Sequence, residues 1–104
     1  SIASTSSPSP IVIGNYSDPY DGGYFIVQIS DTTNNRHQLS EVVVVNDIDN
    51  IYCTEFANLE THSTLGTIGV QKNNNMNQLT FTPIPDIDID VKVCFNSISN
   101  DYDV

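Results

Sequence analysis

Hydrophobic and polar residues alternate with a period of two along much of this chain. Residues 87–95 show it most clearly, with apolar side chains on one face (Ile87, Ile89, Val91, Val93 and Phe95) and other side chains on the opposite face (Asp88, Asp90, Lys92 and Cys94). Successive side chains of a strand point to opposite faces of a sheet, so this pattern is typical of a half-buried strand. We predict a strand here, with its apolar face lining the core.

Six further segments favour strands. Residues 24–30 and 38–45 are rich in β-branched or aromatic residues and flank a polar turn at residues 31–36, which predicts a hairpin. Residues 24–30 are apolar on both faces for most of their length, as in a central strand covered on both sides. The remaining predicted strands are residues 11–13, 51–56, 65–70 and 78–82.

The segments between these strands are dense in turn-forming residues. Residues 14–23 and 72–77 are predicted to be loops, Pro83 and Pro85 interrupt the chain before the last strand, and the glycines are expected to serve turns or a bulge. No apolar spacing of helical type is sustained, so we expect little or no helix.

Short strands joined by such turns predict an all-β fold. We expect an antiparallel β-sandwich of about seven strands, with a partly open β-barrel as the alternative. The Ser-, Thr- and Pro-rich residues 1–10 are expected to form an extended arm or linker that orders only against a partner, with a disordered tail as the alternative. Residues 11–99 are predicted to form the sandwich, and residues 100–104 a short acidic tail.

The charge of the chain limits its partners. Thirteen acidic residues against three basic ones (Arg36, Lys72 and Lys92) give a net charge of −10. Such a chain is repelled by phosphate backbones and by anionic lipid head groups, so we expect neither nucleic acid nor a membrane as partner. No apolar run approaches the roughly 18 to 20 residues that a membrane-spanning helix needs.

Asp86, Asp88 and Asp90 are the candidates for metal binding. Alternate residues share a strand face, and their oxygens could begin a calcium shell if a loop such as residues 47–50 completed it. A straight strand, however, spaces such carboxylates about 6.5 to 7 Å apart, which is wide for one ion. We therefore favour a solvated strand face and predict no metal and no cofactor.

No catalytic signature surrounds the histidines or cysteines. His37 and His62 fall near or in polar segments without a nucleophile-and-base pattern, and Cys53 and Cys94 lack metal-ligand spacing. Alternation places Cys94 opposite the core and Cys53 on a face of mixed character, so we predict free thiols rather than a disulfide. The chain is predicted not to be an enzyme.

One loop could form a recognition surface. Tyr16, Asp18, Tyr20 and Asp21, with Tyr24 beside them, combine aromatic rings and carboxylates and are the candidate partner-binding residues. The alternative is that these tyrosines cap one end of the sandwich.

Three sequence segments resemble a known group of proteins. These are YFIVQISDTTNNRHQLSEVVVV at residues 24–45, ETHSTLGTIG at residues 60–69 and QLTFTP at residues 78–83. Together they resemble a β-rich module of virion structural proteins from contractile-tailed marine phages that infect cyanobacteria, over about residues 21–98. In that group the module lies within longer proteins.

The resemblance implies a role in the virion. The expected function is that of a non-enzymatic structural protein that decorates or stabilises a capsid, neck, tail or baseplate, with other virion proteins as partners in many copies. Contacts could form through loops, sheet edges or residues 1–10. The alternative is an adhesion module whose loops recognise a host glycan or protein.

Overall fold

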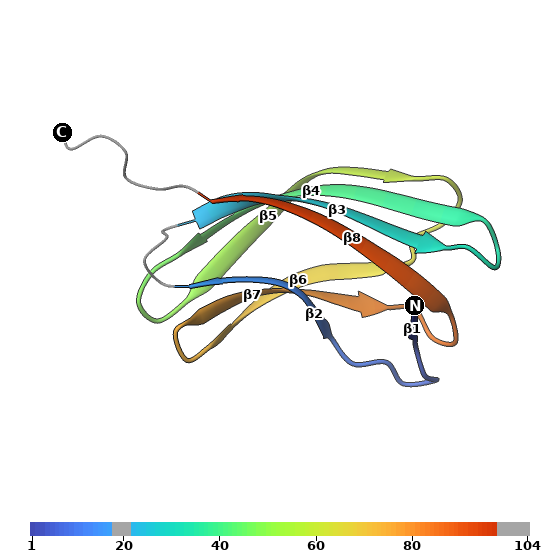
Figure 1. Ribbon diagram of the computed structural model, residues 1–104, viewed down its shortest axis with the longest axis horizontal. Helices are drawn as coiled ribbons and strands as arrows, with labels where there is room; N and C mark the ends of the chain where they lie inside the picture. The colour runs from blue at the N-terminus through green and yellow to red at the C-terminus, as the bar shows by residue number, and fades with distance from the viewer. Residues whose placement is uncertain (18–21, 98–104) are drawn as a thin grey trace.

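The computed structural model describes residues 1–17 and 22–97. Within these ranges all regular structure is β, and no helix is long and apolar enough to cross a membrane. In the described residues eight strands form two antiparallel sheets (Figure 1). The strands are β1 (Ile2–Ala3), β2 (Ile11–Ser17), β3 (Gly22–Asp31), β4 (Arg36–Asn46), β5 (Ile51–Glu60), β6 (Gly66–Asn73), β7 (Met76–Pro83) and β8 (Asp88–Ser97).

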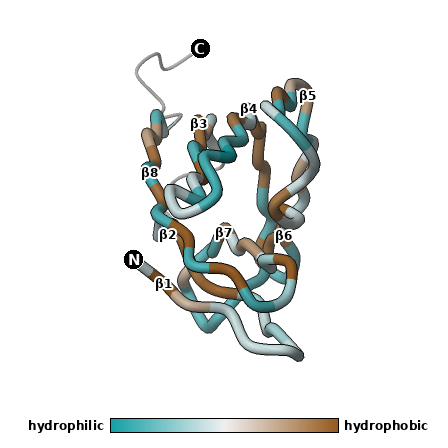
Figure 2. The backbone as a smooth tube through the Cα atoms, turned by 90° about the vertical axis from the view of Figure 1, so that its right-hand side faces the viewer, coloured by the Kyte–Doolittle hydropathy of each residue, from teal (hydrophilic) through white to brown (hydrophobic). Residues whose placement is uncertain are grey.

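The two sheets stack as a β-sandwich, which confirms the predicted fold class. The larger sheet has the order β1-β8-β3-β4-β5 and the smaller one the order β2-β7-β6. Figure 2 shows them as two layers, with β3, β4, β5 and β8 in one and β2, β6 and β7 in the other. The buried core between the layers consists of Tyr16, Phe25, Val27, Ile29, Val42, Val44, Leu65, Leu79, Phe81 and Ile89.

All seven predicted strands are present, and the hairpin between residues 24–30 and 38–45 is confirmed as β3 and β4. On β8, Ile89 is fully buried and Val91 and Phe95 pack against the core, as does Ile87 just before the strand, as the alternation predicted. The prediction is wrong for Val93, which is 37% exposed. The loop predicted at residues 72–77 is shorter, because β6 and β7 pair up to Asn73 and Met76.

The turn predicted at residues 14–23 is partly wrong. β2 continues to Ser17 after an irregularity between Val12 and Gly14, and β3 already begins at Gly22. A Cβ at Gly14 would lie 2.8 Å from Phe25 Cε1, and a Cβ at Gly23 would overlap the ring of Phe95. These two glycines therefore make room for aromatic rings in the core instead of forming turns.

The first residues pack on their own domain. β1 pairs with the start of β8. The Ser4 hydroxyl donates to the carbonyl of Ile84 at 2.7 Å and accepts from the backbone nitrogen of Ile87 at 2.9 Å. Part of the expected arm thus forms an edge of the larger sheet, without a partner chain. The predicted tail at residues 100–104 lies outside the described residues.

Candidate interaction surfaces

The candidate recognition loop is only partly described, since Asp18, Tyr20 and Asp21 lie outside the described residues. Tyr16 is 5% exposed and stacks on Phe95, with ring centroids 5.3 Å apart, while Phe95 stacks in turn on Phe25 at 4.4 Å. The Tyr16 hydroxyl donates to Asn46 Oδ1 at 2.9 Å. Tyr16 therefore packs between the two sheets, in agreement with the alternative that it caps one end of the sandwich.

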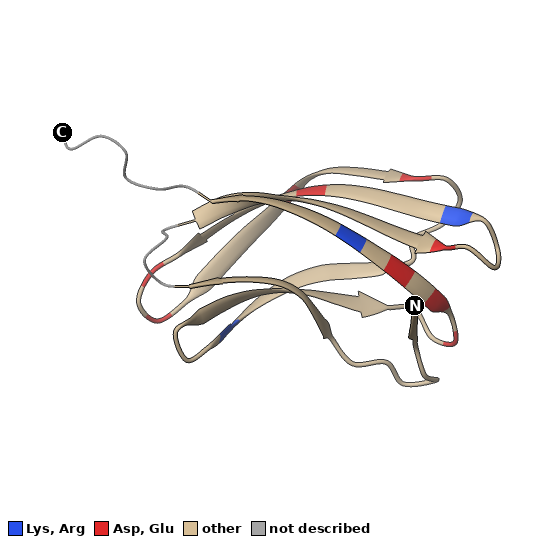
Figure 3. Cartoon of the chain, viewed as in Figure 1, with Lys and Arg blue, Asp and Glu red and all other residues tan. Residues whose placement is uncertain are grey.

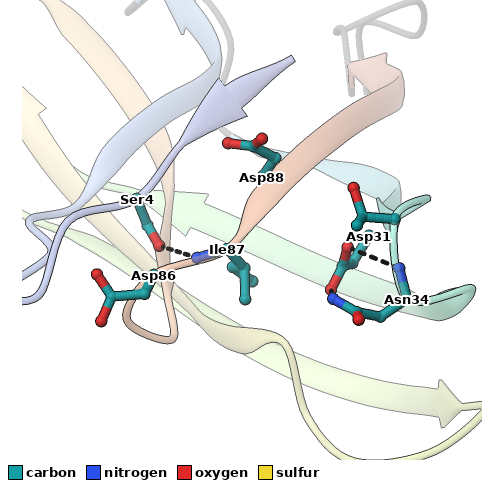
Figure 4. Close-up of a pocket in the computed structure, with 7 residues that line it drawn as sticks. Ser4, Asp31, Asn34, Asp86, Ile87 and Asp88 are labelled. Atoms are coloured by element: carbon teal, nitrogen blue, oxygen red, sulfur yellow. Dashed lines mark hydrogen bonds between the residues drawn. The ribbon is translucent and has the colours of Figure 1, made fainter.

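The acidic candidates do not converge on one point. Asp86 lies in the turn before β8, while Asp88 and Asp90 follow on the strand. A polar depression of about 270 Å³ brings Asp86 and Asp88 near Asp31, yet Figure 4 shows the three carboxylates spread around it. Within residues 1–17 and 22–97 no cluster of three or more potential metal ligands occurs.

The loop at residues 47–50 cannot complete a calcium shell with Asp86, Asp88 and Asp90. The register places Val45, next to this loop, opposite Gly22, and Asp90 opposite Ser30, so the two acidic segments lie at opposite ends of β3. Asp47 Oδ1 instead accepts hydrogen bonds from the backbone nitrogens of Asp49 and Asn50, at 2.9 and 2.7 Å, and shapes its own turn.

The cysteines are free, as predicted. Cys53 pairs with the inward-facing Val44, whereas Cys94 pairs with Ile26 on the other face of the sheet. β3 and β4 separate their strands, so the thiols cannot meet.

His37 Nδ1 is 2.9 Å from Ser30 Oγ and Nε2 is 3.2 Å from Asn35 Oδ1, which ties the ring to the β3–β4 hairpin.

The larger sheet has an apolar outer face, turned away from the core. On β4 and β5 it is formed by six side chains that are each between 38% and 70% exposed: Leu39, Val43, Val45, Tyr52, Phe56 and Leu59. The register sets Val45 opposite Tyr52 and Leu39 opposite Leu59, so the side chains form cross-strand pairs. We call these six residues the outer apolar face.

Shallow depressions mark the surface around the outer apolar face. One of about 270 Å³ lies beside Leu39 and Leu59, and another of about 120 Å³ lies among Val43, Val45 and Tyr52. A third, of about 190 Å³, adjoins Leu39 and Ile26. The face therefore has relief that side chains of another surface can enter.

One charged side chain, Glu41, lies within the outer apolar face, and further charges border it. Figure 3 shows acidic residues near the middle of β4 and β5: Glu41 lies on the outer face between Leu39 and Val43, and Glu55 on the core side opposite Val42. Glu41 is engaged by the Tyr24 hydroxyl, which donates to its Oε1 at 2.7 Å and whose pKa this hydrogen bond raises. Glu60 ends β5, Asp47 and Asp49 lie in the turn before β5, and Lys92 adjoins Leu39, so the border is predominantly acidic.

Sequence reasoning did not identify this face as a surface. The signal was present, because residues 24–30 predicted a strand covered on both sides and residues 42–45 are four consecutive valines. Within residues 1–17 and 22–97 no element covers the outer face of the larger sheet. Ile26 is half-buried there, and Val43 and Val45 are exposed.

Comparison with known proteins identifies a similar fold. No protein-family profile matches the sequence, and the search of curated proteins found no match. Among solved structures, the tailspike protein of Acinetobacter phage vB_ApiP_P1 superposes with a TM-score of 0.55 at 11% sequence identity. The match covers 93% of this chain and 22% of the tailspike chain, so this chain spans about a fifth of that protein. The specific resemblance to cyanobacterial phages stays a prediction.

Proposed function

We propose that this chain is a non-enzymatic structural module of a phage particle that binds other virion proteins. The observation that carries the proposal is the likeness in fold of nearly the whole chain, 93%, to part of a phage tailspike. The amino-acid sequence of residues 24–45 and 60–69 supports the proposal independently, because this sequence resembles a module of virion structural proteins.

The surface of the domain fits protein contact. Its pockets are shallow, and the described residues hold no cluster of metal ligands. The outer apolar face, by contrast, is a broad surface of the kind that proteins bury against one another. We propose that contacts within the particle use this face.

The test is to look for the chain in purified particles of a phage that carries its gene. We expect its peptides at many copies per particle by quantitative mass spectrometry, and additional density in wild-type particles that a deletion mutant lacks. Particles that contain none of the chain would contradict the proposal.

The receptor-binding alternative has its own readout. Labelled full-length chain is added to host cells, with and without competing sugars. Saturable binding that sugars abolish would show that the chain is an adhesion module rather than a purely architectural one. We expect no such binding.

A further inference from the structure

We propose that the outer apolar face is covered by a second copy of this chain, packed sheet against sheet in a symmetric dimer. This inference rests on the proposed use of that face for protein contact and names a second copy of the chain, in place of a different virion protein, as the partner there. It does not depend on a location in a phage particle.

The area of the face is sufficient for a dimer. With the roughly 150 to 250 Å² of aromatic residues taken as an upper range for all six side chains, exposed fractions of 38% to 70% amount to at most about 600 Å² of accessible surface per copy. That is at the upper end of the largest apolar patch on a typical monomer. Two copies together would bury at most about 1,200 Å² from these side chains, which reaches the lower limit for a stable specific interface before any rim contributes.

The shape of the face also suits a second copy. Two sheets stack well when their twists agree, and a second copy necessarily has the same twist. The protruding Leu59, which is 70% exposed, and Tyr52, which is 56% exposed, lie beside depressions of about 270 and 120 Å³. A two-fold axis lets each copy place such side chains into the hollows of the other.

Stacking through the face is favoured over pairing through the edge of the sheet. β5 is the last strand of the larger sheet, but its register shifts between Glu41 and Val42, and Glu55 points to the core side opposite Val42. Irregularities and inward-pointing charges are the features that prevent an edge strand from accepting another strand. At the other edge, β1 pairs only with Asp88 and Ile89 of β8, and the rest of β8 carries Asp90 and Lys92, charges of the kind that keep an edge strand from accepting another strand. The edges are thus protected, whereas the outer apolar face is not.

The charge of the chain predicts how the dimer responds to salt. Two copies with a net charge of −10 each repel one another, and their acidic borders approach in the dimer. Added salt screens this repulsion and strengthens the burial of apolar surface, so dimerisation increases with ionic strength. A partner with a basic border would show the opposite dependence, because salt would weaken its attraction.

The test is analytical ultracentrifugation of the full chain at concentrations up to about 0.5 mM, which detects dissociation constants tighter than about 1 mM. We expect a species of twice the chain mass of 11.4 kDa, with a larger dimer fraction at high salt. Val43→Glu places a charge at a position 44% exposed on the face and should yield a monomer. Val12→Glu is the matched control, since Val12 is 42% exposed on β2 of the other sheet and its variant should still dimerise.

Circular dichroism establishes that each variant is folded. If Val43→Glu does not fold, Leu59→Glu replaces it, because a side chain 70% exposed tolerates a charge. A wild-type chain that stays monomeric at every salt concentration overturns the proposal. So does a dimer that remains intact in both Val43→Glu and Leu59→Glu, a dimer that Val12→Glu also disrupts, or a dimer that dissociates when salt is added. A monomeric chain would contradict the dimer but not the proposed function, because the search for the chain in phage particles tests that function separately.

Discussion

Gln38 Oε1 accepts a hydrogen bond from the backbone nitrogen of Leu65 at 2.8 Å, across 27 residues of sequence. Gln38 is 2% exposed on β4 of the larger sheet, and Leu65, fully buried, directly precedes β6 of the smaller sheet. The bond therefore secures the point where the chain crosses between the two layers. It satisfies a backbone donor that has no access to water.

Replacing Gln38 should weaken this connection. Gln38→Leu keeps the approximate volume but leaves the Leu65 N–H buried without its acceptor, which costs about 1 to 3 kcal/mol. Urea denaturation measures the loss. Gln71→Leu is the control, since the bond from Gln71 Nε2 to Gln78 Oε1 is exposed. Equal stability of wild type and Gln38→Leu would show that the bond contributes nothing.

Gly66 is expected to tolerate no side chain. A Cβ there would overlap the carbonyl oxygen of Thr82 and lie 2.8 Å from Pro83 Cα. Because these are backbone atoms of a paired strand, they cannot move away as a flexible side chain could. Gly66→Ala should cost about 1 to 3 kcal/mol in the free energy of unfolding. Gly69→Ala should cost less, because its Cβ would meet only the side chain of Thr80, at 3.0 Å. The reverse order in a melting experiment would refute this assignment.

Asp31 should make stability depend on pH in the acid range. Hydrogen bonds from Asn34 and Arg36 lower the pKa of this carboxyl from its ordinary value of 3.8. Arg36 donates to Asp31 Oδ2 at 2.6 Å. A lowered pKa in the folded state means that the stabilisation is present above the unfolded-state value and is lost as the pH falls through the folded-state value.

The measurement is thermal unfolding of wild type and Asp31→Asn as the pH is lowered below the ordinary carboxyl pKa. The difference in stability between them should shrink with falling pH, because protonation removes the charge in wild type that the variant lacks at every pH. A difference that stays constant throughout would contradict the role given to Asp31.

Cys53 is expected to react slowly in the folded chain. Desolvation raises the pKa of its thiol, and the Glu55 carboxylate adds to the effect, so less thiolate is present at neutral pH. In a Cys94→Ser variant, alkylation of Cys53 should be slower in the folded chain than in urea. Alkylation at the same rate in both states would rule out this effect.

Calcium is not expected to stabilise the domain, because Asp86, Asp88 and Asp31 surround a depression without converging (Figure 4). Adding calcium or a chelator in low-salt buffer should leave the melting temperature unchanged. A rise with calcium that Asp88→Asn abolishes, but Asp49→Asn does not, would show that these carboxylates hold an ion.

The strands were predictable because their signal is local. Alternation along residues 87–95 and the turn residues around residues 31–36 depend only on neighbours in the sequence, and both correspond to observed elements. The roles of Gly14 and Gly23 were not predictable, since each depends on a phenylalanine ring from another strand. A glycine that admits a ring and a glycine that turns the chain look the same in a sequence.

The outer apolar face likewise depends in part on local sequence and in part on the tertiary structure. The sequence implied that residues 24–30 would be covered on both sides, because apolar side chains on both faces of a strand gain free energy only when both leave water. Which side the domain itself would cover depended on how eight strands divide into sheets of five and three. The smaller sheet covers one side, and the outer apolar face is what the tertiary structure leaves for another surface to bury.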